Sequence, residues 1–127
     1  MPDAALTDLT VVQLAGAIAR GDVTPLQVAE AYLTRIGHLE PHVQAFSYFD
    51  RERVLADAAT LDAEAKSGML RGPLHGVPVA VKDEFHVAGM PTLCAEPDTG
   101  VRSEDSTAVA RLRAAGALIV GKTHMPI

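Results

Sequence analysis

The sequence has one cysteine, no run of basic residues longer than a pair, and no apolar stretch of the length that a membrane-spanning helix needs. A lone cysteine, Cys94, cannot form an internal disulfide, which is typical of proteins in a reducing compartment. A bilayer span takes about 20 apolar residues, and the N-terminus lacks a basic segment followed by an apolar one. The net charge is −5, which does not favour a nucleic-acid-binding surface. We therefore predict a cytoplasmic protein with neither a membrane nor a nucleic-acid partner.

The composition is that of a folded chain. Hydrophobic residues make up 48% of the 127 residues, which is too many for a disordered sequence. A chain of this length can bury roughly 65% of the surface that its unfolded form exposes, enough for one modest core. The sequence contains neither an internal repeat nor a low-complexity segment, so we expect a single globular unit.

The first half of the chain, residues 1–70, has the periodicity of helices. Thr10 and Thr24 each precede a glutamine at the spacing of a capping box, and Pro25 suits a first helical position. Apolar residues then recur on one face. The predicted helices start at Thr10, Thr24 and near Asp50, and they end near Gly21, Gly37 and Gly68.

The second half, residues 71–127, changes to an α/β pattern. Val77–Val81 is a short apolar run that predicts a strand. Pro78 indicates either that the strand starts at this proline or that the strand lies at an edge of the sheet. A helix capped by Asp105 or Ser106 follows, and 117–120 is a second apolar run. Strand, helix and strand in this order predict a βαβ unit with a right-handed crossover. Lys82 and Lys122 fall at the carboxyl ends of the two strands, where ligands of open α/β sheets bind.

Lys82 has two interpretations. In the first, it leaves the sheet for solvent and forms an ion pair with Asp83 or Glu84. In the second, an apolar wall buries Lys82 and favours its neutral amine, which could act as a base with its tip toward the carboxyl side of the sheet. The residues alone leave both open.

Other candidate sites are weaker. Three histidines and the cysteine match no metal-ligand spacing, so we predict neither a metal nor a cofactor. Lys122 precedes Thr123 as in a phosphate loop, but the required earlier glycine and the strand–loop–helix order are missing. The acidic residues Asp83, Glu84 and Glu104 are expected to form a solvated rim. The residues considered for a metal are His75, His86, His124 and Cys94.

Three motifs occur in order in the second half of the chain. Residues 76–83 read Gly-Val-Pro-Val-Ala-Val-Lys-Asp, residues 87–92 read Val-Ala-Gly-Met-Pro-Thr, and residues 111–123 read Arg-Leu-Arg-Ala-Ala-Gly-Ala-Leu-Ile-Val-Gly-Lys-Thr. This ordered triple resembles the amidase signature family, and the helical first half resembles that family's opening helices. The resemblance implies an α/β fold, in which N-terminal helices precede the first βαβ unit of an incomplete mixed sheet. It also implies that residues 1–127 are the N-terminal part of one domain, with a helical region at 1–70 and the start of the α/β core at 71–127.

The family's reaction, hydrolysis or transfer at a carboxamide C–N bond, uses a serine nucleophile, a second serine in a cis peptide, and a lysine. The resemblance places the catalytic lysine at Lys82, acting on a small-molecule amide. The Gly-Ser-rich segment that carries both serines and the oxyanion hole in the family is absent from residues 1–127, where Ser47, Ser67, Ser103 and Ser106 lie in other contexts. His124 also replaces the family's usual asparagine, and Ile127 ends the sequence where an acidic residue would be expected.

Two hypotheses follow from the resemblance and its gaps. The chain is the N-terminal part of an amidase and hydrolyses simple amides only when the rest of the domain is present. Alternatively, it is a non-catalytic stub or interaction module. In either case exposed sheet edges could lead to self-association.

Overall fold

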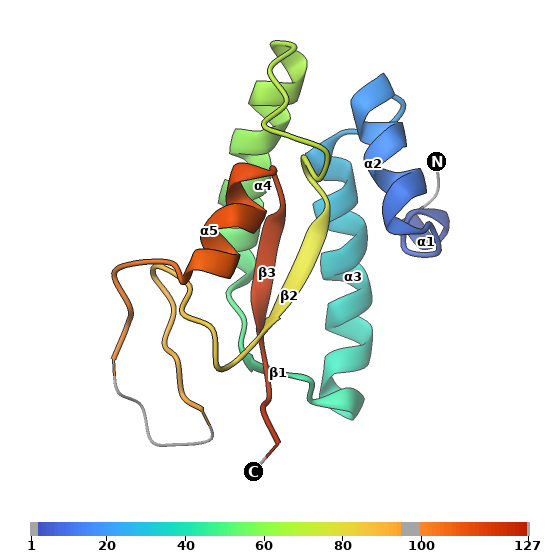
Figure 1. Ribbon diagram of the computed structural model, residues 1–127. Helices are drawn as coiled ribbons and strands as arrows, with labels where there is room; N and C mark the ends of the chain where they lie inside the picture. The colour runs from blue at the N-terminus through green and yellow to red at the C-terminus, as the bar shows by residue number, and fades with distance from the viewer. Residues whose placement is uncertain (1–2, 95–99, 127) are drawn as a thin grey trace.

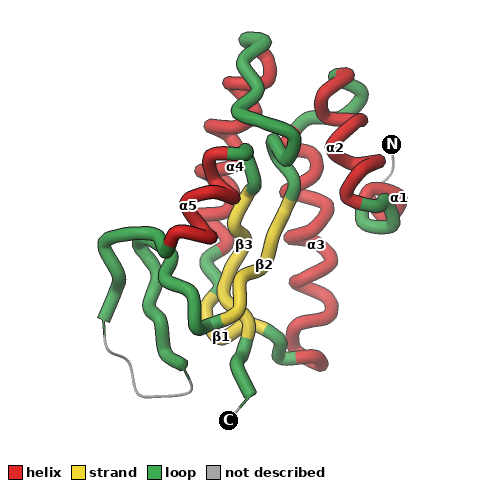
Figure 2. The backbone as a smooth tube through the Cα atoms, viewed as in Figure 1, coloured by secondary structure: helices red, strands yellow, loops and turns green. Residues whose placement is uncertain are grey.

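The computed structural model describes residues 3–94 and 100–126 (Figures 1 and 2). It contains a mixed sheet flanked by helices, which confirms the predicted α/β class. The expected loop at Glu96–Gly100 and the terminal Ile127 lie largely outside these ranges. The elements in chain order are α1 Asp3–Leu6, α2 Val11–Arg20, α3 Pro25–Val43, β1 Phe46–Tyr48, α4 Arg51–Lys66, β2 Pro78–Lys82, α5 Thr107–Ala114 and β3 Leu118–Thr123.

The predicted starts of the first helices are confirmed. Thr10 and Thr24 accept hydrogen bonds from the N–H groups of Gln13 and Gln27, and each glutamine side chain accepts from the threonine N–H in return. These reciprocal bonds satisfy N–H groups that have no partner inside the helix. Gly21 ends α2 in the left-handed conformation, with φ 79°.

The predicted end of the second helix at Gly37 is wrong, because α3 continues to Val43. A helical glycine costs about 1 kcal/mol relative to alanine but does not stop a helix. Pro41 lies inside the helix, and its missing N–H would have bonded to the carbonyl of Gly37. The helix ends instead at Gln44, which adopts a left-handed φ of 51°. None of the described helices is both long enough and apolar enough to cross a bilayer.

The start of α4 near Asp50 is confirmed, because its carboxylate accepts from the N–H groups of Glu52 and Arg53. The predicted cap of α5 is only partly right. Ser106 occupies the cap position without a side-chain cap bond. Asp105 instead accepts from the N–H of Ala88 and pairs with Arg113 at 2.9 Å.

Asp62 links α4 to the start of α3. Its side chain is 7% exposed, pairs with Lys66 at 2.7 Å and accepts from the N–H of Leu26 at 3.3 Å. Burial raises the pKa of Asp62, but bonds from Lys66, Leu26 and Thr24 outweigh it and hold the pKa below its usual value. The charged carboxylate therefore stabilises the junction of the two helices.

We expect Asp62→Asn to lower the free energy of unfolding at pH 7 by about 1–2 kcal/mol, because hydrogen bonds to a charged group are lost. A carboxyl whose pKa is lower when folded stabilises the protein above its unfolded pKa of about 3.9, and this stabilisation is lost as the pH falls through the folded value. Urea unfolding of the variant should therefore decline less between pH 5 and about pH 2. Asp22→Asn, in an exposed pair with Arg20, is the control and should change little. An equal pH dependence of wild type and Asp62→Asn would contradict the assignment.

The sheet has the order β1-β3-β2. β2 and β3 are parallel and joined through α5, which confirms the predicted βαβ unit, and β2 is an edge strand of the described sheet. β1 was not predicted. It pairs antiparallel with β3, with Phe46 opposite Thr123.

Helices cover both faces of the central strand β3. Leu118 and Val120 pack with Leu33 of α3 and Val54 of α4. Ile119, between them in sequence, packs on the other face with residues of β2, α5 and the segment after β2. α3 and α4 therefore cover one face of β3, and α5 covers the other. A third cluster joins α1, α2 and α3 to Val77.

Candidate functional site

The carboxyl ends of β2 and β3 lie side by side, as the sequence predicts. Lys82, the last residue of β2, is paired with Thr123, and Val81 is paired with Lys122. The segment after β2 returns to this edge, where Asp83 donates its N–H to the carbonyl of Thr123 at 2.9 Å. The carboxyl ends of these two strands therefore bring together two lysines and one carboxylate.

Lys82 is exposed rather than buried in this chain. Its side chain is 47% exposed, and its amine pairs with Glu84 at 3.2 Å. The alternation of β2 explains this result, because Ala80 and Lys82 share an exposed face while Val81 and Asp83 are buried. The expected burial is thus absent among the described residues, and the expected ion pair is formed with Glu84.

Asp83 is not part of a solvated rim, which corrects the prediction, whereas Glu84 and Glu104 are exposed. Asp83 is 2% exposed. Its Oδ1 accepts from the N–H of Leu93 at 3.2 Å and lies 3.2 Å from Nζ of Lys122. The reason is the strand alternation, which turns the residue after Lys82 to the opposite face.

Lys122 is the functional candidate that sequence reasoning undervalued. It is fully buried, with 0% exposure. Nζ donates to the carbonyl of Pro91 at 3.0 Å and to the hydroxyl of Thr92 at 3.1 Å, in addition to its pair with Asp83. An ammonium has three N–H donors, so these three oxygens satisfy it. No donor is left for a phosphate.

The histidines and the cysteine do not converge. His75 is buried: its Nε2 lies 2.8 Å from the carbonyl of Leu61, and its Nδ1 accepts from the N–H of Arg71. His86 contacts the Thr92 hydroxyl at 2.9 Å, and Cys94 donates to the carbonyl of Asp83. In the described part of the chain, no group of three histidine, cysteine or acidic residues could hold a metal ion.

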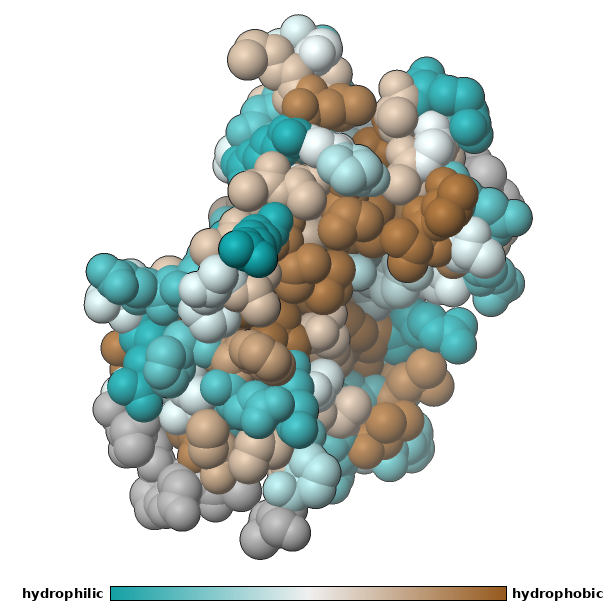
Figure 3. Space-filling model, in the orientation of Figure 1, coloured by the Kyte–Doolittle hydropathy of each residue, from teal (hydrophilic) through white to brown (hydrophobic). Residues whose placement is uncertain are grey.

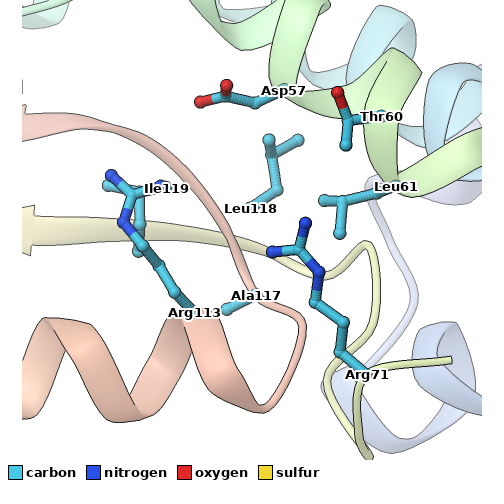
Figure 4. A pocket seen from close by; sticks show the side chains of 8 residues that line it. All are labelled: Asp57, Thr60, Leu61, Arg71, Arg113, Ala117, Leu118 and Ile119. Carbon is cyan, nitrogen blue, oxygen red and sulfur yellow. The ribbon is translucent and has the colours of Figure 1, made fainter. Parts of the chain in front are cut away.

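A cavity of about 130 Å³ lies between α4 and the start of β3 (Figure 4). Arg71 and Arg113 point into it, but Arg71 is already paired with Glu64, and Arg113 with Asp105. The hydrogen bond from Arg71 lowers the pKa of Glu64. Lys82 does not line this cavity, so the cavity and the strand-end lysine are separate features. The lining residues are Asp57, Thr60, Leu61, Arg71, Arg113, Ala117, Leu118 and Ile119.

Comparisons with known proteins identify a consistent group of relatives. The sequence model of the Amidase family matches residues 27–127. The chain is 44% identical over 122 residues to a glutamyl-tRNA(Gln) amidotransferase subunit of Salinispora arenicola, covering 94% of this chain and 25% of the relative. It is 37% identical over 120 residues to an acylamidase of Rhodococcus erythropolis, covering 93% of this chain and 25% of that protein.

Solved structures agree with these relatives. The native peptide amidase of Stenotrophomonas maltophilia superimposes with a TM-score of 0.86 at 35% identity, covering 96% of this chain and 26% of that one. A fatty acid amide hydrolase superimposes with a TM-score of 0.89 at 23% identity, a likeness of fold alone. The chain spans about a quarter of the length of the relatives that it matches.

Proposed function

Because this chain belongs to the amidase family, we propose that it supplies Lys82 as the proton acceptor of a site that hydrolyses carboxamide C–N bonds. The observation that carries the proposal is the position of Lys82 at the carboxyl end of β2, inside the matched residues and on the exposed face of the strand. In open α/β sheets, ligands bind at the carboxyl ends of the strands.

In the proposed mechanism, Lys82 acts with two serines that lie outside residues 1–127. The nucleophilic serine attacks the carboxamide carbon, and its proton passes through the second serine to the neutral amine of Lys82. The C–N bond then breaks, and the leaving nitrogen takes that proton back from Lys82 through the second serine. Water next attacks the acyl carbon and gives its proton to Lys82 along the same path, and the proton returns to the nucleophilic serine as the carboxylic acid leaves. Glu84 must release Lys82 for this role, because the amine that pairs with Glu84 at 3.2 Å has to turn to the second serine.

Three further proposals accompany this role. The substrate is a small-molecule amide, and the protein resides in the cytoplasm, in keeping with the free thiol of Cys94. Residues 1–70 and 71–127 belong to one domain, which the packing of Leu33 and Val54 from the first part against β3 supports.

A non-catalytic interaction module is the second candidate. Two observations favour it: the Lys82–Glu84 ion pair, and the edge position of β2 in the described sheet. Figure 3 shows apolar side chains gathered across the middle of the face that presents β2. Self-association through this edge would then be expected, and the molar mass in solution would rise with concentration.

The test is a chimera in which residues 1–127 replace the matching segment of the Rhodococcus erythropolis acylamidase. We expect the chimera to hydrolyse a simple amide, and Lys82→Ala to lower kcat/KM by about a thousandfold, as for the loss of a general base within a catalytic unit. Lys66→Ala, which removes an exposed lysine paired with Asp62, is the control and should retain activity. Unchanged hydrolysis in a folded Lys82→Ala chimera would refute the base assignment and favour the interaction module.

A further inference from the structure

Lys122 reaches its buried partners because β3 contains a bulge. Val79 is opposite Ile119, but Ala80 is opposite Gly121, so Val120 is an extra residue in β3. Leu118 and Val120 face the α3–α4 cluster, and Ile119 faces the α5 side. Strict alternation from Leu118 would therefore turn residue 122 to the α3–α4 side. The bulge reverses this, since an extra residue re-aims the side chains that follow it.

The reversal separates the two lysines. In a register without the bulge, Lys82 would lie opposite Lys122, and like charges directly opposite each other are destabilising. With the bulge, Lys122 lies beside Val81 and faces Asp83, while Lys82 is opposite Thr123. One strand irregularity thus directs one ammonium inward and leaves the other on the exposed face.

The buried ammonium joins β3 to two other segments, the residue after β2 and the segment at Pro91–Thr92. Its partners are the carboxylate of Asp83, the carbonyl of Pro91 and the hydroxyl of Thr92. Asp83 is further fixed by its own N–H, which donates to Thr123, and by the N–H of Leu93. A buried charge with satisfied partners tolerates few alternative positions, because leaving it unpaired is costly.

We propose that Lys122 is a positioning residue for Lys82. By holding Asp83 inward, Lys122 fixes the residue next to Lys82, and alternation then fixes Lys82 on the opposite, exposed face of the sheet. This inference rests on the proposed function for its catalytic consequence. The holding of Asp83 and of the segment at Pro91–Leu93 is independent of that function.

The first experiment measures amide hydrogen exchange in the chain itself, comparing wild type with Lys122→Met. The amides of Asp83 and Leu93 should exchange at least about tenfold faster, because local opening no longer breaks the ammonium contacts. The amide of Leu118, bonded to Val77 at the far end of the sheet, is the internal control and should change less. Equal acceleration at all three amides, or none, would overturn the holding role. If Lys122→Met does not fold, Thr92→Val removes one partner and keeps the charge pair. Faster exchange at Asp83 and Leu93 than at Leu118 would then support the holding role, and equal or unchanged exchange would overturn it.

The second experiment uses the acylamidase chimera. Lys122→Met should lower kcat by about a hundredfold through misplacement of Lys82, with KM changed by less than about threefold. The double variant Asp83→Asn/Lys122→Met removes both charges and should regain thermal stability without regaining kcat. Recovery of kcat together with stability, or an unchanged kcat in Lys122→Met, would overturn the positioning role. Thr92→Val replaces Lys122→Met here too if the latter is unfolded.

Failure of the proposed function gives a different result. A folded chimera whose activity survives Lys82→Ala would refute the role of Lys82 in hydrolysis. The exchange rates of the Asp83 and Leu93 amides would still decide whether Lys122 holds Asp83 and the segment at Pro91–Leu93. Lys66→Met is the control for loss of a lysine away from the strand ends: kcat should be unchanged, and a loss of stability through Asp62 should affect the Asp83, Leu93 and Leu118 amides alike.

Discussion

Gly116→Ala is expected to lower the free energy of unfolding by about 3 kcal/mol or more, from backbone strain plus a clash that the core must absorb. Gly116 joins α5 to β3 with φ 96°, a conformation that L-residues avoid. A Cβ atom there would lie 2.5 Å from Cα and 2.9 Å from N of His75. The turn at His75 cannot retreat easily, because its ring is buried and bonded to the carbonyl of Leu61.

Substitutions at two other glycines distinguish backbone strain from the clash with His75. Gly21 has a similar φ of 79° and no atom within 4 Å of its would-be Cβ, so Gly21→Ala reports strain alone, about 1 kcal/mol. Gly37 is helical and also unobstructed, so Gly37→Ala should stabilise by about 1 kcal/mol. Urea unfolding followed by circular dichroism measures all three. A Gly116→Ala variant no less stable than Gly21→Ala would show that the approach to His75 is looser than the structure has it.

Leu33→Ala should lower the free energy of unfolding by about 2–5 kcal/mol, the usual cost of a cavity in a packed core. Leu33 is 1% exposed and packs with Val54, Leu61 and Leu118, so it joins two helices and the central strand. The loss should appear in urea unfolding as a lower midpoint with an unchanged slope.

The same helix offers a matched control. Leu39 lies six residues on in α3 and is 43% exposed. Leu39→Ala should therefore change the free energy of unfolding by about 0.5 kcal/mol or less. Equal losses in the two variants would mean that α3 is rotated relative to the sheet.

The sequence predicted those elements whose signals are local. The capping boxes at Thr10 and Thr24 and the cap at Asp50 act within one helical turn, so their residues alone suffice. The strand at Val77–Val81 and the βαβ order were also predictable, because apolar runs and helix breaks record them. Each of these features depends on neighbours in the chain.

The features that escaped prediction depend on distant residues. β1 has three residues and an intermediate burial throughout, and it is a strand only because β3 lies beside it. The inward direction of Lys122 depends on the bulge at Val120. Gly121, a glycine inside the strand, is the one local sign of that bulge, and it did not enter the prediction. The burial of Asp83 could have been inferred from alternation along β2, but the two acidic residues in a row favoured a solvated interpretation.

The central position of β3 has a consequence for the order of events during synthesis. β1 and β2 each pair with β3, and the bond between Ser47 and Lys122 spans 75 residues. A ribosome releases α3 and α4 long before it releases β3, the strand that their apolar faces cover. Helices can form within microseconds, whereas pairings between distant residues are slow. The nascent chain should therefore expose Leu33 and Val54 until residues 118–123 emerge, and this interval is when a chaperone would have the most to bind.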